Sequence, residues 1–199
     1  MTTKLIQGPV GKLPTKFGQF NIVVFKENDL LDHAVIFKGD LADGRPVLCR
    51  IHSECLTGDV FGSLRCDCGF QLEAALKAIE SEGRGALLYM RQEGRGIGLY
   101  NKIRAYQLQD NGVDTVDANV QLGFPPDARE YEACSQIMKN LGFTEVILMT
   151  NNPAKIADIE KHGIKVVDRK PIEFGRNKFN EGYLDTKELR MGHLLHHQD

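Results

Sequence analysis

The last third of the sequence contains a pattern that fixes the direction of two strands. The apolar run VILMT (146–150) is followed by Asn151-Asn152-Pro153, a helical stretch to His162, a glycine and a second strand-like run, IKVVD (164–168). A strand–helix–strand unit implies two parallel strands joined by a right-handed crossover. The fold must therefore contain an α/β portion.

The first quarter of the chain has the composition of β-strands instead. Three segments are rich in β-branched and aromatic residues: FNIVVFK (20–26), HAVIFKGD (33–40) and PVLCRIHS (46–53). Asp43-Gly44, between the second and third segments, predicts a hairpin-type turn. We therefore expect antiparallel strands in this part of the chain.

From Gln71 onward the hydrophobic pattern takes a helical period, which Gly83 is placed to end, and ALLYM (86–90) then reads as a short buried strand. Together these patterns predict an α/β fold, with a mixed α+β arrangement as the alternative. N-terminal antiparallel strands would be followed by alternating helices and strands in a mixed sheet.

Composition limits the partners of such a chain. Of its 199 residues, 42% are hydrophobic and 26% are charged, which is ordinary for a globular protein. The formal net charge of −2 gives no global attraction to nucleic acid. No apolar run approaches the roughly 20 residues of a membrane span, and the N-terminus lacks the apolar core of a signal peptide. We expect a cytoplasmic protein without nucleic-acid or membrane partners.

Three cysteines, Cys55, Cys66 and Cys68, lie close together in the stretch ECLTGDVFGSLRCDCGF (54–70). In a reducing compartment such a cluster indicates metal binding or chemistry rather than disulfides. Thiolates are preferred ligands of zinc. Three protein ligands plus water are typical of a catalytic zinc, whose water has a pKa near ~7.

Other interpretations of the cluster stay open. The cysteines could be buried core residues, or His52 or His193 could complete a closed structural zinc site. His52-Ser53-Glu54 also matches the H-x-E motif of zinc nucleobase deaminases. Those enzymes pair this motif with P-C-x-x-C, whereas this chain has RCDC (65–68), and the mismatch disfavours a deaminase.

The segment RQEGRGIGLYNKIRAY (91–106) follows a predicted strand and opens a predicted helix. Its glycines allow backbone N–H groups to approach an anion, and Arg91 and Arg95 supply guanidinium groups. The turn from Thr150 to Lys155 repeats this arrangement at another strand end. With an open zinc site they suggest a phosphorylated substrate. The alternative is a plain turn with surface arginines.

Three further residues have ordinary structural interpretations. Asp127, after Pro125-Pro126, reads as the N-cap of a helix that continues to Leu141. Arg129 would lie on the first turn of that helix, where residues two apart need not face the same way. Tyr106 could be a core aromatic of the helix after the glycine-rich loop.

These motifs together resemble GTP cyclohydrolase II, the family that commits GTP to riboflavin synthesis. The similar segments are RIHSECLTGD (50–59), LRCDCGFQL (64–72), RQEGRGIGLYNKIRAY (91–106), DTVDAN (114–119), TNNPAK (150–155), GRN (175–177) and YLDTK (183–187). The resemblance implies a single, stand-alone GTP cyclohydrolase II domain over residues 1–199. It would comprise a β-rich part (1–53), a catalytic α/β part (54–170) and a C-terminal extension (171–199).

The resemblance also implies a reaction and its cofactors. GTP would be hydrolysed to formate, pyrophosphate and 2,5-diamino-6-(5-phospho-ribosylamino)pyrimidin-4(3H)-one by a homodimer. One Zn²⁺ per chain would be held by Cys55, Cys66 and Cys68, and Mg²⁺ would accompany the triphosphate. The residues implied in GTP contact are Arg50, Ile51, His52, Ser53, Glu54, Gln71, Glu93, Gly94, Arg95, Thr115, Thr150 and Lys155.

The residues implied in catalysis are Tyr106, Asp127 and Arg129. The family pattern makes Asp127 a proton acceptor and Arg129 a nucleophile, with Tyr106 near the guanine. A guanidinium with a pKa above ~12 is a poor nucleophile, so charge stabilisation is the physically favoured role for Arg129. Two other functions stay open: a zinc-stabilised nucleotide-binding module without chemistry, and another purine-nucleotide ring hydrolase.

Overall fold

The computed structural model describes residues 4–195, so the last four residues of the expected C-terminal extension lie outside the described part. The strands are β1 (Leu5–Gln7), β2 (Gly11–Thr15), β3 (Gly18–Glu27), β4 (Leu31–Lys38), β5 (Val47–Ser53), β6 (Gly85–Met90), β7 (Glu145–Met149) and β8 (Lys165–Lys170). The helices are α1 (Leu56–Asp59), α2 (Cys68–Glu82), the 3-10 helix η1 (Glu93–Gly96), α3 (Gly98–Asp110), α4 (Thr115–Gln121), α5 (Glu132–Asn140), α6 (Pro153–Lys161) and α7 (Glu181–Met191).

The chain forms two compact units that alternate along the sequence. The first unit takes in the chain up to His52, then Leu72–Arg91 and Glu130–Ile172. The second takes in Ser53–Gln71, Gln92–Arg129 and the chain from Glu173 onward.

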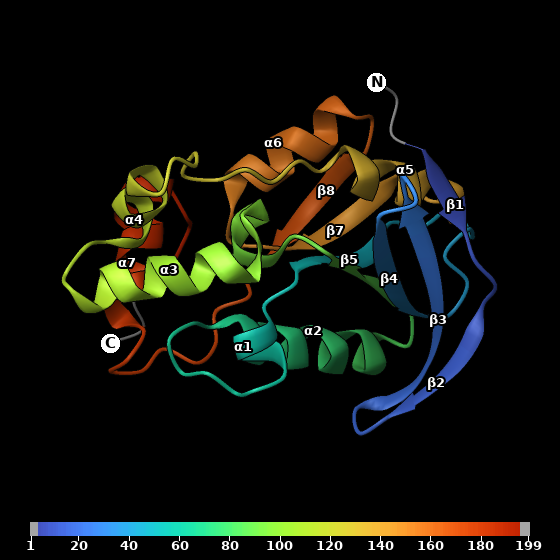
Figure 1. Cartoon of the computed structure of the whole chain (residues 1–199). Coiled ribbons are helices and arrows are strands. Elements are labelled where there is room, and N and C mark those ends of the chain that lie inside the picture. The colour runs from blue at the N-terminus through green and yellow to red at the C-terminus, as the bar shows by residue number, and fades with distance from the viewer. Residues whose placement is uncertain (1–3, 196–199) are drawn as a thin grey trace. The chain divides into compact units, whose positions relative to one another are not determined.

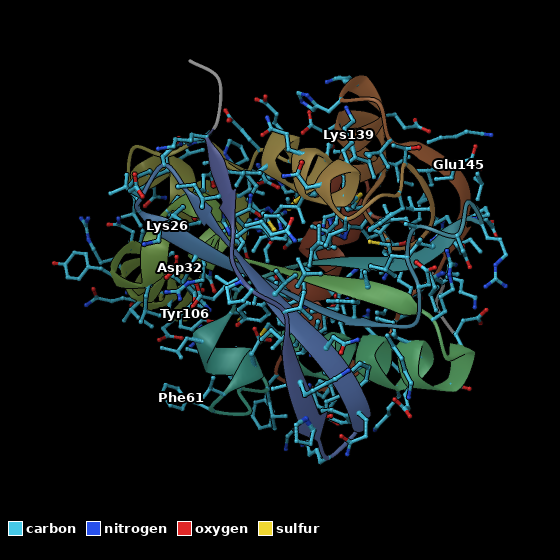
Figure 2. All side chains as sticks on the ribbon, turned by 90° about the vertical axis from the view of Figure 1, so that its right-hand side faces the viewer. Lys26, Asp32, Phe61, Tyr106, Lys139 and Glu145 are labelled. Carbon is cyan, nitrogen blue, oxygen red and sulfur yellow. The ribbon has the colours of Figure 1, made fainter. Side chains whose placement is uncertain are left out.

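The first unit contains a mixed sheet with the strand order β1-β3-β4-β6-β5-β7-β8, and β2 pairs with β3. The strands β1 to β4 and β6 form antiparallel pairs, whereas β5, β7 and β8 pair in parallel. The predicted α/β fold with antiparallel N-terminal strands and a parallel strand–helix–strand unit is therefore confirmed. On β3 and β4 the opposite charges of Lys26 and Asp32 lie directly across from each other, a favourable pairing (Figure 2).

Helices cover both faces of this sheet (Figure 1). On one face α5 and α6 contribute Cys134, Ile137, Met138 and Ile159 to a core that also contains the buried side chains of β5, β6 and β7. On the other face α2 contributes Ala75, Leu76 and Ile79. Because both faces are covered, the residues of β5 and β6 are almost continuously buried rather than alternating between buried and exposed.

The predicted hairpin at Asp43-Gly44 is wrong. The strands β4 and β5 are not neighbours, because β6 lies between them and pairs with β4. The turn belongs to a longer loop in which Arg84 donates hydrogen bonds to the Asp43 carboxylate and to the backbone oxygens of Asp40 and Pro46. A local turn signal does not reveal that a strand from later in the sequence inserts between the two.

The predicted helix start at Asp127 is also wrong. The helix α5 begins at Glu132, with Tyr131 as its N-cap. The backbone N–H of Tyr131 donates to the Asp158 carboxylate at 3.0 Å. A side chain of α6 thus supplies the hydrogen-bond acceptor for the N-cap residue of α5. Residues 127–131 are therefore not helical. Within residues 4–195, no helix has the length and apolar character needed to cross a membrane.

Candidate active site

The second unit brings Cys55, Cys66 and Cys68 together. Cys55 precedes α1 and Cys68 begins α2, and the three sulfur atoms lie within 4.8 Å of one another. The sulfurs of Cys55 and Cys66 are 3.7 Å apart. Zn–S bonds of about 2.3 Å at a tetrahedral angle place two sulfurs about 3.8 Å apart. The donor set and the spacing therefore fit a tetrahedral, thiolate-binding metal ion.

Two glycines make room for this cluster. A Cβ atom on Gly58 would lie 2.9 Å from the sulfur of Cys66 and 3.2 Å from that of Cys55. A Cβ atom on Gly69 would lie 2.4 Å from the backbone oxygen of Gly58. The two segments that carry the cysteines approach so closely that neither position has space for a side chain.

Charged and polar groups surround the sulfurs. Lys102 donates hydrogen bonds to the sulfur of Cys55 at 3.1 Å, to the Thr57 hydroxyl at 3.0 Å and to the Glu93 carboxylate at 2.9 Å. Hydrogen bonds from Cys66 and Cys68, together with Lys102, lower the pKa of Cys55 far below its ordinary 9.0. Hydrogen bonding to Cys55 raises the pKa of Cys66 to about 11 and also raises that of Cys68. A single thiolate is thus favoured, and three would need a cation among them.

Tyr106 reaches the edge of the cluster from α3 and is labelled in Figure 2. Its hydroxyl lies 3.3 Å from that of Thr57, which is 3.7 Å from the sulfur of Cys55. Burial raises the pKa of Tyr106, so the phenol stays neutral. The Arg65 guanidinium lies over its ring at 4.3 Å. The half-buried phenol therefore lies near the sulfur of Cys55, with the hydroxyl of Thr57 between them.

Asp127 and Arg129 form a two-pronged ion pair. Nε and Nη2 of Arg129 donate to the two carboxylate oxygens of Asp127 at 2.9 and 2.6 Å, and Nη1 donates to the Ser53 hydroxyl at 3.3 Å. The two side chains face each other because residues 127–131 are not helical. The predicted helix start at Asp127 gave no reason to expect this contact. Burial favours the neutral acid, but Arg129 outweighs it and lowers the pKa of Asp127 below its ordinary 3.8.

The glycine-rich loop folds as η1 with strained backbone. Gly94 and Arg95 both have φ of 62°, a left-handed conformation that is costly for arginine. The buried Nη1 and Nη2 atoms of Arg95 have no hydrogen-bond partner among residues 4–195. The backbone oxygen of Arg95 accepts from the N–H of Ala128 at 3.1 Å, so the loop lies beside the segment that carries Asp127 and Arg129. An anion would satisfy the two arginine nitrogens.

Three other expected nucleotide contacts also belong to the second unit. Gln71 donates from its side-chain amide to the Asp67 carboxylate at 2.6 Å. Thr115 begins α4, whose N-cap Asp114 accepts from the backbone N–H groups of Val116 and Asp117. Glu54 is partly buried between β5 and Cys55.

The remaining expected contacts lie in the first unit, at the carboxyl ends of two adjacent parallel strands. Arg50 of β5 donates to the backbone oxygen of Met149 at 2.7 Å, and Lys155 of α6 donates to that of Ile51 at 2.8 Å. The His52 ring stacks on Tyr89 with centroids 5.4 Å apart. The hydroxyl of Thr150 accepts from the backbone N–H of Asn152. The first unit therefore gathers Arg50, Ile51, Thr150 and Lys155 near the carboxyl ends of β5 and β7.

Sequence reasoning missed the buried lysines of the second unit. Lys102 contacts the sulfur of Cys55, and Lys187 of α7 donates to the Asp67 carboxylate at 2.6 Å. Burial lowers the pKa of Lys187, but Asp67 outweighs it, so the pKa is raised and the ammonium stays charged. Lysine is ordinarily a surface residue, and its partners here are remote in sequence, so no local pattern marked either one.

Comparison with known proteins decides the family. The model of the GTP cyclohydrolase II family matches residues 9–171. The chain belongs to the GTP cyclohydrolase II family. It is 56% identical over 188 residues to GTP cyclohydrolase-2 of Actinobacillus succinogenes, covering 94% of this chain and 87% of the relative. It is 57% identical over 185 residues to GTP cyclohydrolase-2 of Pseudomonas aeruginosa strain LESB58, covering 92% and 90%.

GTP cyclohydrolase II sequence also occurs within a longer relative. The riboflavin biosynthesis protein RibBA of Phocaeicola vulgatus is 52% identical over 185 residues, which are 92% of this chain and 46% of that protein. The chain is thus a hydrolase of the GTP cyclohydrolase II family, which acts in riboflavin biosynthesis.

Proposed function

We propose that this enzyme hydrolyses GTP to formate, pyrophosphate and 2,5-diamino-6-(5-phospho-ribosylamino)pyrimidin-4(3H)-one, the first step of riboflavin biosynthesis. The observation that carries this proposal is the cluster of three cysteine sulfurs, spaced for a tetrahedral ion, in a chain of this family. Three protein ligands leave a fourth position for water, as in catalytic zinc sites.

In this proposal Cys55, Cys66 and Cys68 hold one Zn²⁺ per chain. When bound, Zn²⁺ would serve as a Lewis acid that lowers the pKa of water, so that hydroxide is available near neutral pH as the nucleophile for C8 of guanine. The neutral phenol of Tyr106 orients that water or donates a proton, since its raised pKa keeps the proton on the oxygen. Glu54, next to Cys55 in the chain, is a second candidate for moving protons.

Arginines and a lysine would neutralise the triphosphate together with Mg²⁺. The unpartnered nitrogens of Arg95 suit a phosphate oxygen, and Lys155 and Arg50 contribute charge at the strand ends. Arg129 acts as a charge stabiliser for the departing pyrophosphate rather than as a nucleophile. Its guanidinium is charged and fixed by the Asp127 carboxylate, which leaves no neutral nitrogen for attack.

Guanine would be distinguished from adenine by side-chain hydrogen bonds. We assign this role to Gln71, whose side-chain amide donates to Asp67, and to Glu93 and Gly94 of the glycine-rich loop. A site built to hydrogen-bond a polar group rejects an analogue that lacks it by orders of magnitude. ATP should therefore not be a substrate.

We further propose that residues 1–199 act as one domain in a cytoplasmic homodimer. The family match runs through segments of both units, which supports a single functional domain. The proposed contacts with GTP are completed by Ile51, His52, Ser53, Thr115 and Thr150.

The test is to incubate zinc-loaded protein with GTP and Mg²⁺ and to measure formate and pyrophosphate separately. We expect both products from GTP and neither from ATP. Absence of formate from protein shown to carry one zinc per chain would rule out the proposed reaction. Formate without pyrophosphate would indicate a ring hydrolase that retains the triphosphate.

A further inference from the structure

We propose that Lys187, from the C-terminal helix α7, is a positioning residue for the metal site: by holding Asp67 it fixes the Cys66–Cys68 turn and Gln71. The inference rests on the metal site proposed above. It assigns to α7 a task that lies outside the family match, which ends at residue 171.

The contacts of the Asp67 carboxylate carry this proposal. One oxygen accepts from Nζ of Lys187 at 2.6 Å, and the other accepts from the side-chain amide of Gln71 at 2.6 Å. The side chains of Asp67 and Lys187 are only 4% and 11% exposed. Asp67 is the single residue between Cys66 and Cys68, so a change in its orientation turns the backbone that aims both sulfurs.

The helix α7 is itself anchored within the second unit. Its Arg190 pairs with Asp114 and Asp117 at the start of α4, and Leu184 is buried. Before the helix, the fully buried Asn180 donates from its side chain to the backbone oxygen of Gly175 at 2.8 Å. The buried contacts of Leu184 and Asn180, rather than the exposed ion pairs of Arg190, fix where Lys187 presents its ammonium.

Tyr183 adds a second connection from the same helix. Its ring lies 4.4 Å from Nζ of Lys187 and 5.8 Å from the guanidinium carbon of Arg95. Through Tyr183, the helix that carries Lys187 also contacts Arg95, whose buried guanidinium nitrogens have no hydrogen-bond partner among residues 4–195.

A positioning role explains why an ion pair is used here. A buried ion pair is weak evidence for stability, since desolvation offsets much of the attraction, but it defines a geometry. Groups that orient metal ligands without touching the ion commonly change metal affinity 10–100-fold when removed. Lys187 would act in this way through Asp67, without contact with the ion.

The experiment compares Lys187→Met with Lys187→Arg and with Arg190→Met, which removes a cation from the same helix. For each full-length protein, zinc affinity is measured by competition with a chromophoric chelator, and the visible spectrum of the Co²⁺-substituted protein is recorded. We expect Lys187→Met to weaken zinc binding at least about 10-fold and to alter the thiolate-to-cobalt bands. Lys187→Arg should restore most of both signals, and Arg190→Met should leave them unchanged.

Asp67→Asn tests the same inference if Lys187→Met does not fold, because it removes the charge that Lys187 contacts. It should weaken zinc binding as much as Lys187→Met, and the double variant should lose no more than either single one. Wild-type affinity and spectrum in Lys187→Met would overturn the inference, as would equal losses in Lys187→Met and Arg190→Met. Failure of the wild-type protein to bind zinc or cobalt would instead refute the metal site itself.

Discussion

The ammonium of Lys102 lies 3.1 Å from the sulfur of Cys55, inside the group of side chains that surrounds the cysteine cluster. Burial disfavours its charged form, but Cys55 and Glu93 outweigh this effect and raise the pKa of Lys102, so the charge is kept. Three thiolates around a divalent cation carry a net negative charge, which this ammonium offsets. Lys102 therefore balances the charge of the cluster whether it is empty or filled.

Replacing Lys102 should be far more costly than replacing an exposed lysine. Lys102→Met leaves the buried Glu93 and Cys55 without their cation, so we expect the free energy of unfolding to fall by about 3 kcal/mol. Lys77→Met, whose pair with Glu73 is exposed, should cost about 0.5 kcal/mol or less. Urea unfolding of the zinc-free proteins measures both, and similar losses would contradict the assigned role.

Cys66→Ser should abolish stoichiometric zinc binding and formate release. The hydroxyl is a poor substitute for a thiolate, and two remaining sulfurs do not hold the ion tightly. Cys134→Ala is the matched control, since Cys134 is buried in α5 within the other unit, and it should keep one zinc per chain. Elemental analysis and the formate assay report the outcome. Full zinc content in Cys66→Ser would refute the metal assignment.

Two helical glycines should respond in opposite ways to alanine. Gly58→Ala places a methyl group 2.9 Å from the sulfur of Cys66, so zinc affinity should fall about 10-fold or more. Gly182→Ala in α7 meets no atom within 4 Å and should raise stability by about 0.5 kcal/mol, with unchanged zinc affinity. Chelator competition and thermal unfolding separate the two effects. Equal zinc affinity in both variants would show that the cluster tolerates a side chain at Gly58.

Arg95→Met should stabilise the free protein and weaken anion binding. The variant removes two buried nitrogens without hydrogen-bond partners among residues 4–195, which should raise the free energy of unfolding by about 1 kcal/mol. Inorganic pyrophosphate should raise the melting temperature of the wild type but not of Arg95→Met. Arg104→Met, exposed on α3, is the control and should behave as wild type. Equal protection of all three proteins by pyrophosphate would contradict the assignment.

The ion pair of Asp127 and Arg129 should stabilise the folded protein at neutral pH and lose this effect in acid. Because the pKa of Asp127 is lowered in the folded protein, its stabilising effect is fully present above the ordinary pKa of 3.8 and is lost as the pH falls below it. The stability difference between wild type and Asp127→Asn should therefore be constant from pH 7 to about 5 and shrink in stronger acid. Urea unfolding across this range measures it. A difference that stays constant or grows as the pH falls below 3.8 would show that the pKa of Asp127 is not lowered in the folded protein.

The sequence predicts the strand–helix–strand unit correctly because its signals are local. The apolar runs that became β7 and β8 flank a turn whose Asn152 caps α6, and all of these residues are close in the chain. The cysteine cluster could also be recognised from the sequence, since two of its members are separated only by Asp67. What the sequence could not show is the insertion of β6 between β4 and β5, which depends on pairing with a remote strand.

The same reasoning explains the errors at the site. Asp127 after two prolines has the local signature of an N-cap, yet its carboxylate binds Arg129 and the helix begins at Glu132. Lys102 and Lys187 were overlooked because a buried lysine is recognised only by its partners. Those partners, Cys55 and Asp67, are 47 and 120 residues away.

The alternation of the two units along the sequence limits how such a protein can be divided or extended. The chain passes from one unit to the other after residues 52, 71, 91, 129 and 172, so no single cut separates them. A fragment made by cutting the chain inside this alternation would leave at least one of the two units incomplete. Addition of a module outside this stretch leaves both units whole, and in the Phocaeicola vulgatus relative more than half of the protein lies beyond the matched part.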